Sequence, residues 1–397
     1  MTAQPLKILW QSNAPWCGTG YGQQTRHILD GIVELGHKPT LFAYWGLQGG
    51  TLSTGKYPVL PPGRDPYGND IIGAHMLRTE ADICITLIDP WILKNYGEAT
   101  KNTWYPYTPV DHEPIAPKLK ESLMGATEII AMSHFGERTL REAGFENVIY
   151  IPHVVNTTAL SRYTADPEGW RHKVLGREPG DFIVGMVAAN KGEPSRKGFQ
   201  QALEAFALFL KKHPNAYLYM HTDPTQDDDG VDMEAYMKLI GVPGDHVQFP
   251  ERYSLWLGFP DEFMKNMYSA LDVLLVPSMG EGFGVPIIEA QACGTPVVGT
   301  AFSSIPELIM PGGGYLAAPR TKYITPLKSY QVIPDVNDLA DGLEWAYDHR
   351  ADETVQKVCE ENAAQYDKGL ILQTHWKPFL ERVAEEIGAT VATVNVG

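Results

Sequence analysis

The chain has 397 residues, more than one ordinary hydrophobic core accommodates, so two domains are expected. With 44% hydrophobic and 20% charged residues, its composition is that of a globular enzyme. The formal net charge of −16 disfavours nucleic acid and anionic lipid as partners, because both carry negative charge themselves.

Neither a membrane segment nor a targeting segment is expected. No apolar run is long enough to span a bilayer, and the N-terminus lacks the charged and apolar regions of a signal peptide. We therefore expect a cytoplasmic protein without stable membrane insertion.

The sequence also predicts no metal site. The four cysteines are scattered and fit neither a metal spacing nor a disulfide framework: Cys17, Cys84, Cys293 and Cys359. The run Asp227–Asp229 favours an acidic surface loop, because calcium loops space their ligands at alternate positions.

Short apolar runs alternate with helical segments along the first part of the chain, which is typical of βαβ units on a parallel sheet. The expected strands are Ile8–Trp10, Pro39–Ala43, Ile83–Leu87, Trp104–Tyr107, Ile129–Ala131 and Val148–Ile151. Helices are expected over 21–35 and 134–143. A long loop rich in Gly and Pro is expected over 46–70.

A polar stretch over 156–181 interrupts this alternation and predicts the linker between the domains. Its basic residues Arg171, His172, Lys173 and Arg177 favour a solvated helix over a docking surface for an anionic partner.

The alternation resumes after the linker. The expected strands are Phe182–Ala188, Tyr217–Met220, Val247–Phe249, Val273–Val276 and Pro296–Gly299. Helices are expected over 198–212, 231–240 and 260–270, from about Val285, and from about Val336 to near the end. The pattern predicts an α/β protein of two doubly wound parallel-sheet halves with C-terminal helices. Ligands of such sheets bind beyond the carboxyl ends of the strands.

The most informative motif follows the expected strand Val273–Val276 and covers 277–290. Gly282 and Gly284 allow a ligand close to the backbone, and Pro286 suits the first turn of a helix. The free N–H groups at that helix start favour an anion such as a diphosphate. Glu281 and Glu289 provide carboxylates that accept hydrogen bonds from sugar hydroxyls. Alternatively, each glutamate alone is an ordinary capping or solvated residue.

This motif resembles the E-G-F-G-x-P-x-x-E-A signature of the retaining GT-B glycosyltransferases of family 4. The continuation over 292–298 and the turn over 303–308 are also similar to that family, although the usual glycine before the turn is absent. The resemblance implies that Glu281 and the amides of the next residues contact the donor sugar, and that Glu289 binds the ribose hydroxyls. These next residues are Gly282, Phe283, Gly284 and Val285.

The segment over 190–199 carries two adjacent cations, Arg196 and Lys197, near a strand end and a helix start, which suits a diphosphate. In the resembled family an Arg follows the strand directly and a Lys comes about six residues later. Lys197 matches that Lys, but Asn190 stands in the place of the Arg. Either Arg196 or Lys191 supplies the missing charge.

Two segments of the N-terminal half complete the expected site. The loop after the first strand contains Gly18 and Gly20 and resembles the family's glycine loop, which lies against the donor and acceptor. The segment 107–114 resembles the one whose His touches the donor sugar. The candidate for that contact is His112, and Asp111 is the competing candidate.

The resemblance extends over about residues 7–310. It implies a GT-B fold, with two Rossmann-like domains facing a cleft and C-terminal helices that cross back. The domains are expected at 1–160, which binds the acceptor and is joined by a helix over about 368–397, and at 161–367, which binds the nucleotide-sugar donor. Trp376, Phe379 and Leu380 are expected on the buried face of that helix.

The implied function is hexosyl transfer from a nucleotide-diphosphate sugar to a hydroxyl acceptor, with retention and without metal or cofactor. The expected catalytic residues are His112, Asp111 and Glu281. The expected donor-binding residues are Gly18, Gly20, Asn190, Arg196, Lys197, Gly282, Phe283, Gly284, Val285 and Glu289. The acceptor stays open among a glycan, a protein, a small molecule and a modified nucleic acid.

Three other functions compete with this one. A sugar-nucleotide epimerase and a non-catalytic nucleotide-sugar binding protein share the architecture. A nicotinamide dehydrogenase requires G-x-G-x-x-G after the first strand, and Gly18, Gly20 and Gly22 do not give that spacing.

Overall fold

The computed structural model describes residues 4–163, 169, 171–192, 194–225 and 229–394. Asp227 and Asp228 of the expected acidic loop, and residues 164–168 and 170 of the expected linker, lie outside this described part. The chain divides into two compact units. The first comprises Met1–Val154, Leu327–Ser329 and Asp367–Gly397, and the second comprises Val155–Pro326 and Tyr330–Tyr366. The second unit therefore begins at Val155, where the sequence placed the boundary at 161.

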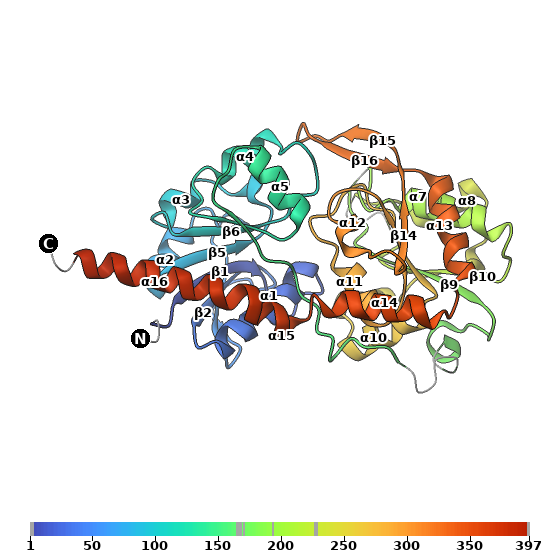
Figure 1. Ribbon diagram of the computed structural model, residues 1–397, viewed down its shortest axis with the longest axis horizontal. Coiled ribbons are helices and arrows are strands. Elements are labelled where there is room, and N and C mark those ends of the chain that lie inside the picture. The colour runs from blue at the N-terminus through green and yellow to red at the C-terminus, as the bar shows by residue number, and fades with distance from the viewer. Residues whose placement is uncertain (1–3, 164–168, 170, 193, 226–228, 395–397) are drawn as a thin grey trace. The chain divides into compact units, whose positions relative to one another are not determined.

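The first unit is built on a sheet with the strand order β3-β4-β2-β1-β5-β6-β7-β8 among the described residues (Figure 1). Neighbouring strands are parallel except for the antiparallel pair β3–β4. The strands are β1 (Lys7–Asn13), β2 (Lys38–Trp45), β3 (Leu52–Ser53), β4 (Pro58–Leu60), β5 (Ile83–Leu87), β6 (Trp104–Thr108), β7 (Ile129–Ala131) and β8 (Val148–Tyr150). β5 and β6 are buried along their whole length, as expected for a parallel sheet covered on both faces.

The helices of the first unit connect these strands, and one apolar cluster from β1, β5, β6 and the helices forms a core. They are α1 (Gly20–Glu34), α2 (Ile72–Thr79), η1 (Pro90–Ile92), α3 (Tyr96–Ala99), α4 (Pro117–Leu123) and α5 (His134–Glu142). α1 and α5 start where a hydroxyl side chain caps the first turn: Thr19 accepts from the Gly22 amide and Ser133 from the Gly136 amide.

The second unit contains a parallel sheet with the order β11-β10-β9-β12-β13-β14 in its described part. The strands are β9 (Phe182–Val187), β10 (Ala216–His221), β11 (Val247–Gln248), β12 (Val273–Val276), β13 (Val297–Thr300) and β14 (Gly314–Ala317). A separate antiparallel hairpin pairs β15 (Pro319–Ile324) with β16 (Tyr330–Pro334).

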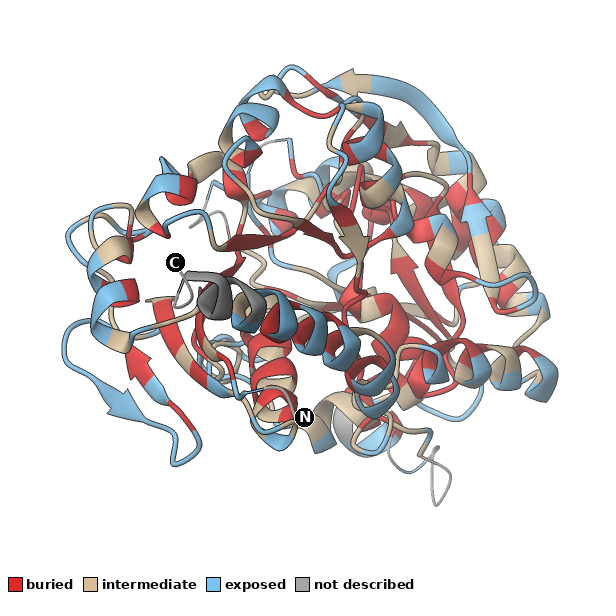
Figure 2. Ribbon diagram, turned by 60° about the vertical axis from the view of Figure 1, so that its left-hand side comes forward, coloured by how far each residue is buried: buried red, intermediate tan, exposed pale blue. Residues whose placement is uncertain are grey.

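Helices follow most of these strands and bury their apolar faces against the sheet, which Figure 2 shows largely in red. They are η2 (Arg171–Leu175), α7 (Phe199–Leu210), α8 (Met233–Ile240), η3 (Gly244–His246), α9 (Arg252–Leu257), α10 (Asp261–Ala270), α11 (Val285–Ala292), α12 (Ile305–Leu308), α13 (Val336–Asp348) and α14 (Glu353–Ala364). Two parallel-sheet Rossmann-like domains with C-terminal helices, as the sequence predicts, are confirmed.

The differences from the sequence prediction fall where strands are short or exposed. The expected loop over 46–70 contains β3 and β4, and β14, β15 and β16 were not expected. Apolar runs of two or three residues are too short to give a strand pattern. β15 is mostly exposed, so it lacks the alternation of buried and exposed residues that marks a strand.

The structure corrects the expectation that the basic stretch of the linker is a solvated helix. Arg171 is buried, with 7% of its surface exposed, and its Nη2 donates to Asp272 Oδ1 at 2.7 Å. The guanidinium of Arg177 lies 3.9 Å from the centre of the Tyr217 ring. The expected solvated helix is therefore wrong for these two arginines, because each found a buried or aromatic partner that is distant in the sequence.

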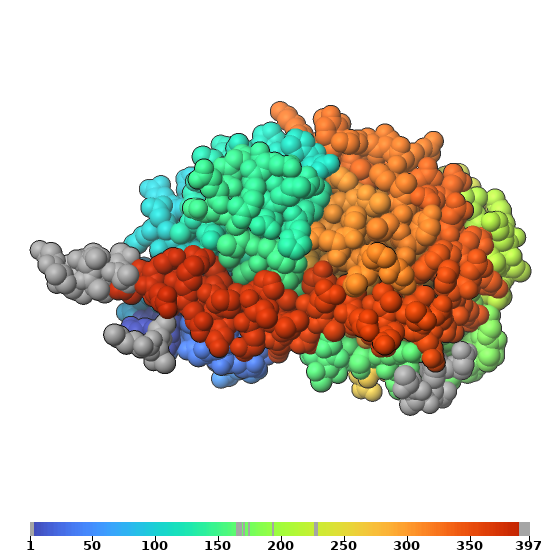
Figure 3. All heavy atoms as spheres, in the orientation of Figure 1, coloured from blue at the N-terminus to red at the C-terminus, as the bar shows by residue number. Residues whose placement is uncertain are grey.

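The helices over 368–394 belong to the first unit and lie on its surface (Figure 3, where α14 of the second unit is also red). The segment consists of α15 (Lys368–Ile371), a π-helical turn η4 (Leu372–Trp376) and α16 (Lys377–Val394). The expected buried face is confirmed, since Trp376, Phe379 and Leu380 are at most 4% exposed. The Trp376 ring lies 5.7 Å from the ring of Trp10 and 5.5 Å from that of Tyr107, centre to centre.

We expect Trp376→Ala to destabilise the first unit by about 3–5 kcal/mol, because the substitution opens a cavity between η4 and the sheet. The measurement is urea unfolding followed by circular dichroism. Leu370→Ala is the control, because Leu370 lies in the same segment and is 46% exposed. Equal midpoints for the two variants would show that the C-terminal helices do not stabilise this unit.

Candidate functional site

The loops after β9 and β12 carry most of the expected donor-binding residues, and the structure joins these two loops. The Met279 amide donates to the Arg196 carbonyl at 2.7 Å. Gly198 has a φ of +70°, and a Cβ at this position would lie 2.0 Å from the Pro277 carbonyl oxygen. Only glycine allows so close an approach of the two backbones.

Two cationic side chains of the site, Lys197 and Arg196, lie against the carboxylate of Glu281. Lys197 Nζ donates to Glu281 Oε1 at 2.6 Å, and Arg196 Nη1 lies 3.5 Å from Oε2. The Ser278 hydroxyl also donates to Oε1, at 2.7 Å. The Glu281 side chain is only 9% exposed, whereas those of Lys197 and Arg196 are 22% and 46% exposed. The cations therefore keep surface available for a second anion.

Burial by itself would raise the pKa of Glu281, but the positive charges of Lys197 and Arg196 outweigh it and hold that pKa below its ordinary value. The carboxylate is thus ionised at neutral pH.

A pair of serines fixes the loop that carries Glu281. The Glu281 amide donates to the Ser303 hydroxyl at 2.8 Å, and the Ser304 hydroxyl donates to the carbonyls of Glu281 and Phe283. Ser303 has a φ of +55°, the conformation for which glycine is the usual residue. Sequence reasoning noticed the missing glycine here but did not foresee that the serine side chains brace the site.

α11 begins directly after this loop, as expected. Gly284 is the residue before the helix and Pro286 lies in its first turn. Phe283 is 3% exposed and packs edge-on against Tyr366, with ring centres 5.6 Å apart. A cavity of about 20 Å³ is lined by residues of this loop and of β9, including Lys197, Glu281 and Gly284. The helix start and the cations thus border one small hollow.

Glu289 lies one turn inside α11 and is 9% exposed. Its Oε2 accepts a hydrogen bond from the hydroxyl of Tyr268 at 2.7 Å. Tyr268 is fully buried, and burial together with the Glu289 carboxylate raises the pKa of its hydroxyl well above the ordinary value. The tyrosine therefore remains a neutral donor that orients Glu289. The spacing of the motif found this glutamate, but only the fold brings Tyr268 to it.

Asn190 holds a neighbouring loop in place. Its amide nitrogen donates to the carbonyls of Asp223, Thr225 and Val231 at 3.2, 3.0 and 2.8 Å, and its Oδ1 accepts from the Val231 amide at 2.9 Å. These bonds occupy the polar atoms of the side chain. Of the alternatives for the missing charge, Arg196 is the one that the structure brings to Glu281.

In the first unit, His112 and Asp111 follow β6, as expected. The Nδ1 of His112 lies 2.7 Å from Asp111 Oδ1, which orients the ring. His112 is 4% exposed, and its Nε2 is buried without a hydrogen-bond partner. A buried polar atom in this state is costly unless a ligand satisfies it.

The loop after β1 contains Gly18 and Gly20, whose contact with the donor stays a prediction. A Cβ at Gly18 or at Gly20 would meet nothing within 4 Å, so a Cβ is sterically possible at both positions. The position that requires glycine is Gly22, where a Cβ would lie 2.5 Å from the Cys17 carbonyl oxygen. Thr19 starts α1 and is held by Asn13, whose Nδ2 donates to the threonine hydroxyl at 2.7 Å.

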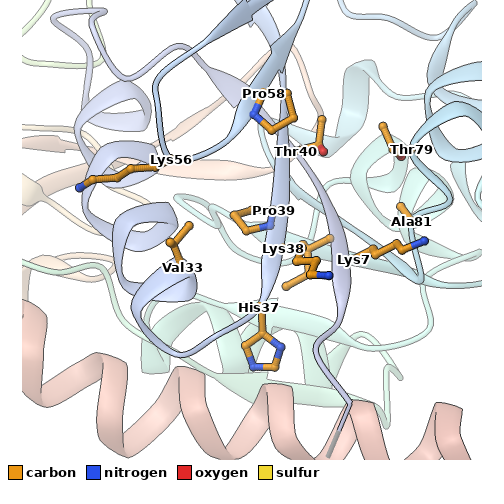
Figure 4. Close-up of a pocket in the computed structure, with 11 residues that line it drawn as sticks. Lys7, Val33, His37, Lys38, Pro39, Thr40, Lys56, Pro58, Thr79 and Ala81 are labelled. Atoms are coloured by element: carbon orange, nitrogen blue, oxygen red, sulfur yellow. The ribbon is translucent and has the colours of Figure 1, made fainter.

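A cavity of the first unit lies away from these residues (Figure 4). It measures about 320 Å³ and is lined by residues such as Lys7 and Lys38, the first residues of β1 and β2. It therefore opens at the amino ends of the strands, opposite the edge at which such sheets bind ligands.

Two further findings concern only the described residues. The described residues include no group of three or more His, Cys, Asp and Glu side chains placed to hold a metal ion. No helix within them combines the length and apolar character that crossing a membrane requires.

Comparisons with known proteins agree with the fold and the motif. Residues 181–347 match the family model of the glycosyl transferases group 1. A glycosyltransferase of Sulfolobus islandicus rod-shaped virus 1, itself uncharacterised, is 26% identical over 218 residues, which is 53% of this chain. The chain spans 58% of the length of that viral protein and smaller shares of the next curated relatives.

Two solved structures share the fold over nearly the whole chain. The sucrose-phosphate synthase of Thermosynechococcus elongatus superimposes with a TM-score of 0.75 and 19% identity, covering 96% of this chain and 100% of that one. HepE of Anabaena in complex with UDP-glucose gives a TM-score of 0.69 at 19% identity, covering 97% and 100%. Residues 181–347 therefore match the glycosyl transferases group 1, and the chain has the GT-B fold of these solved structures over nearly its whole length.

Proposed function

We propose that the protein transfers a hexose from a nucleotide-diphosphate sugar to a hydroxyl of an acceptor, with retention of configuration and without a metal ion. The observation that carries this proposal is the cluster of Lys197, Arg196 and Glu281 beside the start of α11. Cations and a helix start at the carboxyl edge of a parallel sheet together form a site for a diphosphate.

In this proposal the donor diphosphate binds to the exposed parts of Lys197 and Arg196 and to the amides after Gly282. The bond between the sugar and the diphosphate oxygen breaks, a bond from the acceptor oxygen to the same carbon forms, and the hydroxyl proton passes to the departing diphosphate. Negative charge grows on the leaving group in this step. Fixed cations and amides stabilise it without reorganising, a form of stabilisation that usually dominates catalysis.

Glu289 is the candidate for the ribose hydroxyls. The hydrogen bond from Tyr268 occupies Oε2 and holds the carboxylate in one orientation. A carboxylate has acceptor positions for further donors, and two adjacent ribose hydroxyls match them. Tyr268 acts here as a positioning residue.

His112 is the candidate for a contact with the donor sugar, and Asp111 orients it. With Nδ1 bonded to Asp111, the buried Nε2 of His112 remains for a sugar hydroxyl. Asn190 contributes indirectly, because its side chain is bonded to the loop over 223–231 rather than directed to a ligand.

The donor tested first should be UDP-glucose, because HepE, which shares this fold, was solved in complex with it. A sugar-nucleotide epimerase is the competing function. It would convert the donor without any acceptor, whereas a transferase releases the nucleotide at a rate that rises with acceptor concentration.

Lys197→Met should weaken the binding of UDP or GDP by about tenfold or more, the effect of losing one charge-assisted hydrogen bond. Affinity for the uncharged nucleoside should stay unchanged, because Lys197 is assigned to the diphosphate. Isothermal titration calorimetry measures both affinities. Lys238→Met, at an exposed position of α8 in the same unit, is the control. An equal loss for nucleoside and nucleotide would overturn the assignment.

Glu289→Ala should reduce donor affinity by an order of magnitude or more through loss of the ribose contact. The check is a thermal-shift titration with UDP, GDP, ADP and their sugars. A ligand at about a hundred times its Kd raises stability by roughly 2.7 kcal/mol. Glu361→Ala provides an exposed glutamate of α14 as control. Near-normal affinity with a 2′-deoxy nucleotide and with the Glu289→Ala variant would refute the ribose role.

A further inference from the structure

The proposed reaction makes no use of the cavity at the amino edge of the first unit's sheet (Figure 4). The walls of this cavity come from the amino ends of β1 and β2, from the last turns of α1 and α2, and from the segment that leads into β4. Its volume of about 320 Å³ reaches the range of small-molecule sites, which begins at about 300 Å³. The cavity is therefore large enough for a small organic molecule.

Aliphatic side chains from four segments line this cavity: Ile8, Val33, Pro39, Pro58 and Ala81. Ile8 and Pro39 occupy paired positions on β1 and β2, and both are buried. An apolar group that enters the cavity would leave water and contact these side chains, which is favourable in proportion to the area buried. The walls thus favour a ligand with an apolar body.

Three lysines also line the cavity, whereas the described residues that line it include no Asp or Glu. Two of these lysines have carboxylate partners outside the cavity. Lys7 donates to Glu80, and Lys56 Nζ donates to Asp30 Oδ2 at 2.8 Å. Figure 4 shows the side chains of Lys7 and Lys56 on opposite sides of the cavity.

Lys38 is the third lysine, and it forms no ion pair with any residue that the structure describes. It is exposed, and its position on β2 is paired with that of Lys7 on β1. Like charges at paired positions of neighbouring strands repel each other. Glu80 compensates the charge of Lys7, so the uncompensated charge at the cavity is that of Lys38.

His37 adds a neutral polar group to the wall. Its Nδ1 accepts a hydrogen bond from the Leu6 amide at 3.2 Å, so the proton of the neutral ring lies on Nε2. Burial lowers the pKa of His37, and the carboxylate of Glu381 only partly opposes this shift. The positive charge of the wall at neutral pH therefore comes from the lysines.

We propose that this cavity binds a small apolar monoanion, an aliphatic or aromatic carboxylate, at a site separate from that of the proposed reaction. The apolar body packs on the aliphatic walls, and the carboxylate lies against Lys38. One uncompensated cation matches one negative charge. The aliphatic walls disfavour a strongly hydrated ion such as inorganic phosphate, because burial would remove its water.

A purely structural role for Lys38 is the competing explanation. The last turns of α1 and α2 reach the cavity, and cations stabilise the negative ends of helices. In that case the loss of the charge would lower the stability of the protein and leave ligand binding unchanged. Binding and stability are therefore measured on the same variants.

The test is isothermal titration calorimetry on the full chain with hexanoate, heptanoate, octanoate and phenylacetate. Hexan-1-ol is the uncharged probe, and inorganic phosphate is the hydrated anion. The variant Lys38→Met removes the charge, and Ala81→Leu narrows the cavity. Lys94→Met is the matched control, because Lys94 is an exposed lysine of the same unit. Lys197→Met tests whether the acids bind to the cations of the second unit instead, and urea unfolding reports the stability of each variant.

Wild type, Lys94→Met and Lys197→Met should bind the aliphatic acids with equal affinity. That affinity should rise about fourfold for each added CH₂ group, which corresponds to ~0.8 kcal/mol. Lys38→Met should bind each acid about tenfold more weakly, the effect of losing a charge-assisted hydrogen bond, and hexan-1-ol as well as wild type does. Ala81→Leu should weaken the binding of the acids and of the alcohol alike.

Four results would overturn the inference. They are equal affinity of Lys38→Met and wild type for the acids, no binding of any acid to wild type, tighter binding of inorganic phosphate than of the acids, and loss of acid binding in Lys197→Met. The last result would place the acids at the cluster on Glu281. None of these measurements uses a nucleotide, so failure of the donor site would leave the outcome unaffected.

Discussion

The ion cluster on Glu281 is the interaction on which the organisation of the second unit's site depends. A buried carboxylate is stable only when cations and hydrogen bonds compensate its charge, and Lys197, Arg196 and Ser278 do so here. Because the cations come from the loop after β9 and the carboxylate from the loop after β12, this compensation also fixes the two loops relative to each other.

The surrounding contacts reinforce that arrangement. Close backbone approach at Gly198 and the hydrogen bonds of Ser303 and Ser304 leave the loop before α11 little freedom. The helix start and the cations are therefore in place before any donor binds, which reduces the cost of ordering them during the reaction. Asn190 likewise fixes the neighbouring loop, because its side chain is hydrogen-bonded to the backbone of Asp223, Thr225 and Val231.

The first unit presents a different kind of edge. Its polar groups include a histidine oriented by Asp111 and unpartnered atoms at the end of β1. This chemistry suits uncharged hydroxylated ligands, whereas that of the second unit suits an anion.

The sequence by itself determined the fold class, most strands and helices, and the positions of Glu281, Glu289 and Lys197, because buried parallel strands and a helix start with glycine and proline have local patterns. It also identified the buried face around Trp376. Only the tertiary structure decided which residues meet across the chain: Tyr268 with Glu289, Ser303 with the Glu281 amide, and Arg171 with Asp272. Such pairs depend on the order of strands in the sheet and on loop geometry, and neither leaves a pattern in neighbouring residues.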